Sequence, residues 1–202
     1  MRPILDIPYS PGAYRPIDLT GLTDAGCREA LAGYWDMPGV RVAYGGYMER
    51  RGLYDGFSHF QPAPGQERNI HLGLDLWAPA GTPVLVPEAA TVHSWGHRKA
   101  PGDYGPVILL RHESAQGPLY TLYGHLSPES LKGLVPGKVL PQGALLATLG
   151  QESVNGGYAP HLHFQLIRDP GDYRGDYPGV CSLQEVDFYR ENCPDPLPFL
   201  GW

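Results

Sequence analysis

Residues 71–87 read HLGLDLWAPAGTPVLVP, and the first six of them alternate strictly between leucine and other side chains. Successive side chains of a β-strand point to opposite faces, so this alternation predicts a strand with its three leucines in the core. His71 and Asp75 then lie together on the opposite face. A helix accounts for the pattern less well. The stretch therefore predicts a half-buried strand that presents an imidazole and a carboxylate.

Residues 161–166, HLHFQL, repeat this design, because three apolar side chains alternate with His161, His163 and Gln165. The 27 Gly and 22 Pro in 202 residues suit many short strands joined by turns. Further apolar runs bounded by such residues predict strands at 83–86, 90–95, 107–112, 119–126 and 144–149. We therefore expect a mainly β fold.

The segments that flank this core differ in composition. Residues 1–60 are rich in Gly, Pro, Tyr and Arg and predict an irregular extension, with one helix at 23–34 that Thr23 or Asp24 caps. The prolines of the last ten residues, CPDPLPFLGW, predict neither a helix nor a central strand. We expect three parts, which are an extension at 1–60, a core domain at 61–170 and a tail at 171–202 that wraps the core.

The charge of the chain bears on its partners. The formal net charge is -6, and no run of Lys and Arg is longer than two residues, so nucleic acid and anionic membranes are not expected as partners. The apolar runs are far shorter than the roughly 20 residues of a transmembrane helix. The first 16 residues hold prolines and charges in place of the apolar region of a signal peptide. We expect a cytoplasmic location, with export by another route left open.

Three cysteines occur, Cys27, Cys181 and Cys193. Their odd number and the lack of Cys-x-x-Cys spacing argue against a dense disulfide framework and against a thiolate zinc site. Reduced, structural cysteines are favoured, and a bridge between Cys181 and Cys193 is the open alternative.

Two imidazoles and one carboxylate from the two alternating segments form a three-ligand set. Such a set is typical of a catalytic zinc with an open fourth position, whereas closed structural sites use four ligands rich in Cys. Zinc (Zn²⁺) is the favoured metal. A third segment, YTLYGHL at 120–126, places Thr121, Tyr123 and His125 on one face by the same alternation. Each spacing alone is a weak motif, and surface histidines on a half-buried sheet are the structural alternative.

Five stretches, in this order, resemble the lysostaphin-type zinc endopeptidases: HLGLDLWAPAGTPVLVP (71–87), DYGPVILLRH (103–112), YTLYGHL (120–126), LVPGKVLPQGALLATLG (134–150) and APHLHFQL (159–166). The resemblance covers roughly half of the chain and implies an antiparallel β-sheet core of barrel or sandwich type. By motif position it implies that His71, Asp75 and His163 bind zinc. It also implies that His125 and His161 are the catalytic pair.

The resemblance implies hydrolysis of peptide bonds in a peptide or a peptidoglycan fragment, including glycine-containing peptides. Residues 1–60 and 171–202 lie outside it, and the loop at 155–158 replaces a shorter turn before the H-x-H strand, so substrate specificity does not transfer. Two other functions stay open. One is a non-catalytic regulatory or binding module, whose members commonly lack the zinc ligands, and the other is a metal-dependent hydrolase of another amide.

Overall fold

The structure, a computed structural model, describes residues 2–54, 56–61, 63–114 and 117–202. The strands are β1 Tyr14–Pro16, β2 Val42–Gly45, β3 Ile70–His71, β4 Leu74–Trp77, β5 Pro83–Leu85, β6 Ala90–Arg98, β7 Gly105–His112, β8 Leu119–Gly124, β9 Val139–Leu140, β10 Leu145–Thr148, β11 His161–Ile167 and β12 Val180–Cys181. The α-helices are α1 Asp24–Trp35, α2 Val186–Asn192 and α3 Pro196–Leu200. Short 3₁₀ turns cover Gly52–Tyr54, Ser58–Phe60 and Pro128–Leu131. Within the described ranges, no helix has the length and apolar character that crossing a membrane requires.

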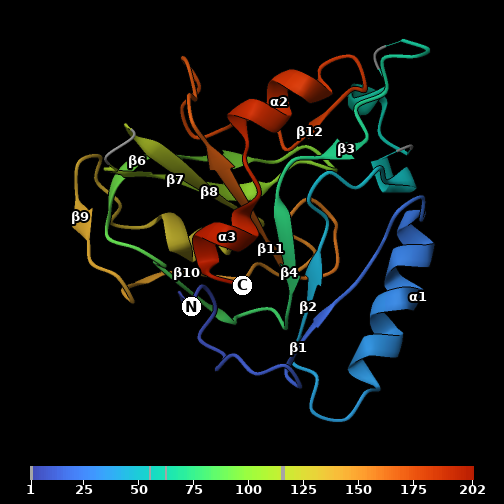
Figure 1. Ribbon diagram of the computed structural model, residues 1–202, viewed down its shortest axis with the longest axis horizontal. Coiled ribbons are helices and arrows are strands. Elements are labelled where there is room, and N and C mark those ends of the chain that lie inside the picture. The colour runs from blue at the N-terminus through green and yellow to red at the C-terminus, as the bar shows by residue number, and fades with distance from the viewer. Residues whose placement is uncertain (1, 55, 62, 115–116) are drawn as a thin grey trace.

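Eight strands form one large sheet in the order β1-β2-β4-β11-β8-β7-β6-β9 (Figure 1). All neighbouring strands in it run antiparallel except β1 and β2, which are parallel. Two further ribbons pair β10 with β5 and β12 with β3, both antiparallel. The prediction of a mainly β fold with an antiparallel core is confirmed.

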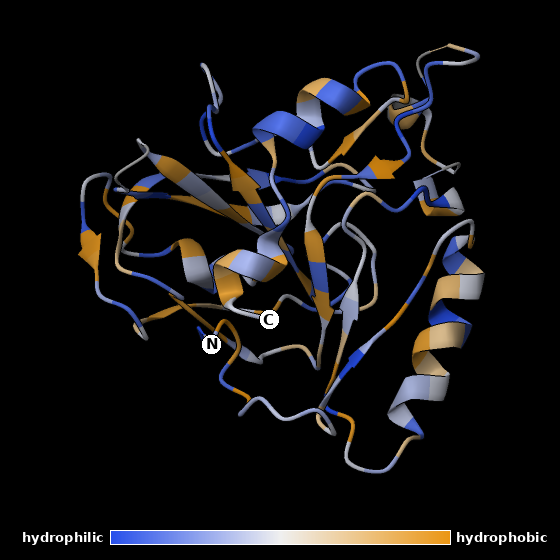
Figure 2. Ribbon diagram, in the orientation of Figure 1, coloured by the Kyte–Doolittle hydropathy of each residue, from blue (hydrophilic) through white to orange (hydrophobic). Residues whose placement is uncertain are grey.

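The alternation in β4 and β11 builds the main core as the sequence predicts. Leu162, Phe164 and Leu166 of β11 pack with Leu74 and Leu76 of β4 in one buried cluster. Figure 2 shows the corresponding alternation of hydrophobic and hydrophilic residues along β4. Burying a side chain of this size stabilises the fold by roughly 1.5–3 kcal/mol. The other face of the two strands is left for polar side chains.

One detail of this prediction is wrong. Leu72 does not join the two other leucines, because the chain leaves β3 at His71 and begins β4 only at Leu74. Leu72 packs instead with Ile70 and Cys181 in a separate cluster. A break in the strand therefore separates His71 from Asp75, which strict alternation does not foresee.

The N-terminal extension contains the expected helix and two strands that the sequence did not reveal. The Thr23 side chain caps α1 by accepting a hydrogen bond from the backbone N–H of Gly26, and α1 buries Cys27 and Leu31. Strands β1 and β2 are only three and four residues long, too short for a periodic pattern. They nevertheless extend the large sheet, and β2 lies directly beside β4.

The C-terminal tail places Leu200 in the main core cluster and contains two short helices. The prediction that its prolines exclude a helix is wrong for α3. Pro196 lies in the first turn, where a missing backbone N–H costs no helical hydrogen bond, and the Asp195 side chain caps the turn. Gly201 ends the helix with φ 75°. The backbone N–H of Arg2 donates to the Leu200 carbonyl at 2.8 Å, which holds the two ends of the chain together (Figure 1).

All three cysteines are buried and free. The bridge between Cys181 and Cys193 that the sequence left open is not formed. The Cys193 sulfur accepts a hydrogen bond from the side-chain amide of Gln165 at 3.3 Å. This contact ties the tail to β11.

Candidate metal centre

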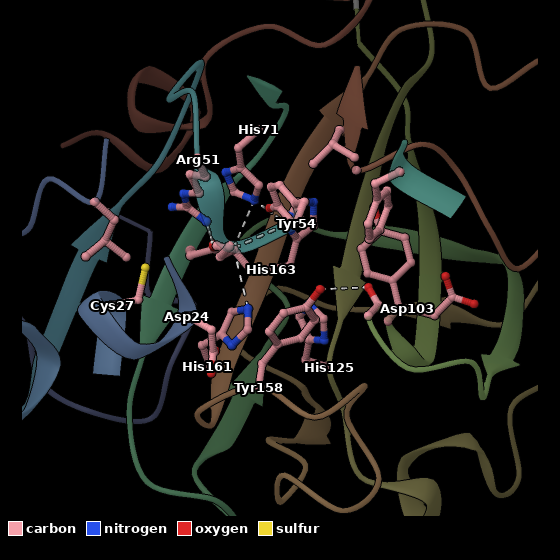
Figure 3. A pocket seen from close by; sticks show the side chains of 18 of the residues that line it. Asp24, Cys27, Arg51, Tyr54, His71, Asp103, His125, Tyr158, His161 and His163 are labelled. Carbon is pink, nitrogen blue, oxygen red and sulfur yellow. Dashed lines mark hydrogen bonds and ion pairs between the residues drawn. The ribbon is translucent and has the colours of Figure 1, made fainter. Parts of the chain in front are cut away.

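Three of the residues singled out from the sequence meet on the polar face of β4 and β11. In the antiparallel register, His163 lies directly opposite Asp75. Asp75 Oδ1 is 3.2 Å from His163 Nδ1 and 3.3 Å from His71 Nε2, and the two ring nitrogens are 2.8 Å apart. Figure 3 shows the two histidines and the neighbouring Arg51 gathered around this point. The three side chains form a buried group of the kind that can hold a metal ion.

Gly73, in the break between β3 and β4, makes room for this group. A Cβ atom at this position would lie 2.7 Å from both Cε1 and Nε2 of His163, and 2.9 Å from the Phe164 carbonyl oxygen. Any larger residue would therefore push the His163 ring out of place. The glycine of the segment His71-Leu72-Gly73-Leu74-Asp75 is thus explained by a close approach between side chain and backbone.

Hydrogen bonds on the far side of each ring fix which nitrogen faces the centre. The Nδ1 of His71 lies 2.9 Å from the Gly46 carbonyl oxygen, which can only accept, so this nitrogen carries the proton. The Nε2 of His163 lies 2.9 Å from Oε1 of Gln165. The amide nitrogen of Gln165 already donates to the Pro178 carbonyl, so its oxygen accepts from His163. Both inward nitrogens consequently present lone pairs.

The two carboxylate oxygens of Asp75 lie in different surroundings. Oδ2 forms an ion pair with Nη1 of the buried Arg51 at 2.5 Å. Oδ1 is buried and has no hydrogen-bond partner. Three acceptor lone pairs, two from nitrogen and one from this oxygen, therefore face one another, an arrangement that a bound cation relieves. The residues present fit a metal ion.

The charges of the group are those that metal ligands need. Burial lowers the pKa of His71 to about 4, and the charge of Arg51 acts in the same direction. Burial alone would raise the pKa of Asp75, but electrostatic interactions with the His71 ring and the Arg51 guanidinium outweigh it and hold this pKa well below its ordinary value. At neutral pH the imidazole is neutral and the carboxylate ionised, which is the state that binds metal.

His125 and His161 lie together beside this group. Their ring centroids are 4.2 Å apart, and His161 Nε2 is 3.8 Å from Asp75 Oδ1. The Nδ1 of His125 is 2.7 Å from the Asn155 carbonyl oxygen, and the Nδ1 of His161 is 2.7 Å from the Ala159 carbonyl oxygen. Both rings therefore carry their proton on Nδ1 and have an unprotonated Nε2. Burial lowers the pKa of each, and for His125 the neighbouring histidines lower it further.

His125 reaches the site by a different route from the one that the sequence predicts. Tyr123, expected on the same face, packs in the main core with its ring 5.3 Å from that of Phe164. Strand β8 ends at Gly124, and His125 follows with φ 62°. This left-handed residue turns its side chain away from the Tyr123 face, toward His161. The expectation that Thr121, Tyr123 and His125 share a face is therefore wrong.

A cavity of about 250 Å³ opens above the five residues, and all three parts of the chain line it. Tyr104 and Tyr158 of the core stand beside His125, with ring centroids 5.6 and 5.2 Å away. Trp77 stacks on His161 at 5.6 Å and 26°. Further walls come from α1, from the 3₁₀ turns at 52–54 and 58–60 and from residues 173–180 of the tail. A molecule bound here would contact the extension and the tail as well as the core.

The other histidines whose side chains the structure describes do not line this cavity. His112 is buried against Thr121, His93 lies beside Ser94, and His97 is exposed. The side chain of His59 lies outside the described part of the chain. Sequence reasoning missed Arg51, since a single arginine carries no motif. The position of Gln165, two residues beyond His163 on one strand face, was a signal that could have identified its role.

Comparisons with known proteins identify the family and the fold. The sequence pattern of Peptidase family M23 matches residues 69–174, which is just over half of the chain. DD-carboxypeptidase/endopeptidase Mpg of Neisseria meningitidis serogroup B is 33% identical over 97 residues, which are 48% of this chain and 20% of that protein. The protein of the same name from Neisseria gonorrhoeae matches equally. The chain thus spans about a fifth of the length of the curated relatives that it matches.

Two solved structures of lysostaphin are also similar. The solution structure aligns over 79% of this chain and 50% of that chain, with a TM-score of 0.50 and 21% identity. The catalytic domain from Staphylococcus simulans aligns over 66% of this chain and 81% of that chain, with a TM-score of 0.45 and 25% identity. The solution structure shows that the fold is shared.

Proposed function

Because the chain belongs to peptidase family M23, we propose that it is a zinc-dependent metalloendopeptidase. Family membership confirms the resemblance drawn from the sequence and places the chain in a family of hydrolases. One observation carries the proposal for the metal. Three acceptor atoms, on His71, Asp75 and His163, lie within 3.3 Å of one another with their lone pairs turned inward.

Zinc suits these atoms better than other common metals. Two imidazole nitrogens and one carboxylate oxygen, with no thiolate, form a set found at catalytic zinc sites that keep an open position. The three atoms are 2.8, 3.2 and 3.3 Å from one another, so a single ion bound here would be held by all three residues. Bound there, zinc supplies a Lewis acid that polarises a carbonyl group and lowers the pKa of water.

His161 and His125 perform the proton transfers in this proposal. His161 Nε2, next to the ligand Asp75, accepts the proton of the water that attacks the peptide carbonyl. The His125 ring is close enough to receive this proton and to deliver it to the departing amine. The carbonyl oxygens that hold both Nδ1 atoms keep the two Nε2 atoms available for this exchange.

We propose a peptide or a peptidoglycan-type peptide as substrate. The relatives from Neisseria are named DD-carboxypeptidase/endopeptidase, which is an activity on such peptides. The cavity supports this choice, because Tyr104, Tyr158 and Trp77 give it aromatic walls close to the histidines. Such walls offer packing surface and polar tips to a peptide backbone.

Zinc content and peptide hydrolysis, measured on the same variants, test the proposal. Alanine at His71, Asp75 or His163 is expected to abolish both zinc binding and hydrolysis. Alanine at His125 or His161 is expected to keep the zinc and abolish hydrolysis.

His93→Ala is the matched control, since this histidine lies outside the cavity, and we expect it to change neither property. Hydrolysis that persists in both catalytic-pair variants would reject the assigned roles. A wild-type protein that binds zinc but cleaves no member of a peptide library would favour the binding-module alternative.

A further inference from the structure

Residues 46–51 of the N-terminal extension lie outside the family match, which begins at residue 69. They nevertheless contact two of the three proposed metal ligands. Strand β2 brings them there, because Gly45, its last residue, pairs with Asp75 of β4. The family pattern therefore does not contain every residue that surrounds the metal centre of this chain.

Arg51 decides which oxygen of Asp75 faces the histidines. Its Nη1 binds Oδ2 at 2.5 Å, so Oδ1 is the oxygen left for a metal ion. The arginine is itself held in place, since its Nε donates to Oε2 of Glu49 at 2.9 Å and its side chain is only 2% exposed. Its guanidinium also lies over the Trp77 ring at 5.6 Å. A buried side chain with this many partners has one position.

Gly46 fixes which ring nitrogen of His71 faces the metal centre. Its carbonyl oxygen lies 2.9 Å from Nδ1 of His71 and thereby turns the lone pair of Nε2 inward. A Cβ atom on Gly46 would lie 2.1 Å from Nη2 of Arg51 and 2.9 Å from Nδ1 of His71, and φ is 107°. Only glycine lets the backbone pass between the arginine and the histidine.

Backbone hydrogen bonds fasten the segment to the strand that carries His71. The N–H of Met48 donates to the His71 carbonyl, and the N–H of His71 donates to the Glu49 carbonyl, both at 2.9 Å. The N–H of Arg51 donates to the Asn69 carbonyl at 2.9 Å. The segment and the ligands thus form one rigid unit.

We propose that residues 46–51 are a built-in part of the metal centre and that Arg51 is a positioning residue for the ligand Asp75. This inference rests on the proposed zinc site. A positioning role and a purely electrostatic role for Arg51 predict opposite changes in zinc affinity when the arginine is removed. A guanidinium acting only through its charge repels a cation, so its removal would strengthen zinc binding. A guanidinium that positions Asp75 has the opposite effect, and its removal weakens zinc binding.

The experiment compares Arg51→Met and Arg51→Lys with wild type. Zinc affinity is measured by competition with a chromophoric chelator, and the absorption spectrum of the Co²⁺-substituted protein reports the ligand geometry. Arg51→Met is expected to weaken zinc binding by about 10- to 100-fold, the usual effect of losing a partner behind a metal ligand. Arg51→Lys keeps the charge without the two-pronged geometry, so an intermediate loss is expected. Both variants should change the Co²⁺ spectrum.

Arg68→Met is the matched control. Arg68 lines the same cavity, but it donates to the Val180 carbonyl and lies over the Phe60 ring, away from the ligands. We expect wild-type zinc affinity and a wild-type Co²⁺ spectrum. A loss equal to that of Arg51→Met would show a general effect of removing an arginine and would overturn the inference.

Two failures are distinguishable. A wild-type protein that binds no zinc refutes the proposed function itself. A wild-type protein that binds zinc, together with folded Arg51 variants that bind it equally or more tightly, refutes only the positioning role. If circular dichroism shows that Arg51→Met does not fold, Arg51→Lys decides, and wild-type affinity with an unchanged spectrum in that variant contradicts the inference.

Discussion

Gly73→Ala tests the geometry of the metal centre without touching a ligand. The added Cβ atom would lie 2.7 Å from the His163 ring, and an ordinary contact begins at 3.4 Å. The φ angle of Gly73 is outside the left-handed region, so alanine causes no backbone strain. The perturbation is therefore almost purely a displacement of His163, by about 0.7 Å, the difference between those two distances.

The magnitude follows from what holds the ring in place. The His163 ring is tied to Gln165 by a hydrogen bond, and the added Cβ atom would also lie 2.9 Å from the Phe164 carbonyl oxygen. Overpacking of this kind costs about 1–3 kcal/mol. If this cost falls on the metal-bound state, zinc affinity drops roughly 5- to 140-fold, at about 1.4 kcal/mol per factor of ten.

Competition with a chromophoric chelator measures the zinc affinity, and chemical denaturation of the metal-free protein measures folding. Gly33→Ala in α1 is the control, since a Cβ atom there meets nothing within 4 Å. That change should leave zinc affinity unaltered and stabilise the fold by up to about 1 kcal/mol. Wild-type zinc affinity in Gly73→Ala would refute the geometry described for His163.

Three further outcomes are expected. Removal of zinc with a chelator should lower the melting temperature by roughly 5–10 °C relative to protein at a free zinc concentration 100 times Kd. Zinc binding at that concentration adds about 2.7 kcal/mol to the free energy of unfolding, and an unchanged melting curve would contradict a zinc site in the folded protein. Phe164→Ala, at a fully buried core position, should lower the free energy of unfolding by about 3–5 kcal/mol in urea denaturation, and a loss below 1 kcal/mol would be inconsistent with the core. Burial lowers the pKa of His112 in the folded protein. Below about pH 6.5 the unfolded state therefore binds more protons than the folded state. The free energy of unfolding thus decreases as the pH falls from about 6.5 toward the folded-state pKa. His112→Gln should flatten that fall, by at most about 1.4 kcal/mol per pH unit for one proton, and an identical pH dependence in both proteins would contradict it.

Alternation in the sequence predicts those features that depend on an uninterrupted strand. Leu162, His163 and Phe164 face as expected because β11 is regular over seven residues. Strict alternation fails where the backbone departs from a strand, at Gly73 before β4 and at His125 after β8. A left-handed φ at a histidine leaves no trace in a pattern of apolar and polar residues.

The contribution of the extension was beyond prediction for a different reason. Arg51 and Gly46 belong to a segment without periodicity, and their roles depend on the pairing of β2 with β4, a contact between residues far apart in the chain. The helix α3 was missed because prolines are compatible with a first helical turn, where Pro196 lies. Local sequence rules describe such segments poorly, since tertiary contacts decide their conformation.

X-ray absorption spectroscopy of the zinc-loaded protein tests the central claim most directly. The metal should show two imidazole ligands and a carboxylate oxygen at roughly 2.0–2.2 Å, with one further light-atom position and no sulfur. His163→Ala protein treated with zinc in the same way should retain no zinc at the site and should lose this imidazole signal. A sulfur shell, a third or fourth imidazole, or an unchanged spectrum in that variant would show that the metal binds elsewhere and would contradict the account.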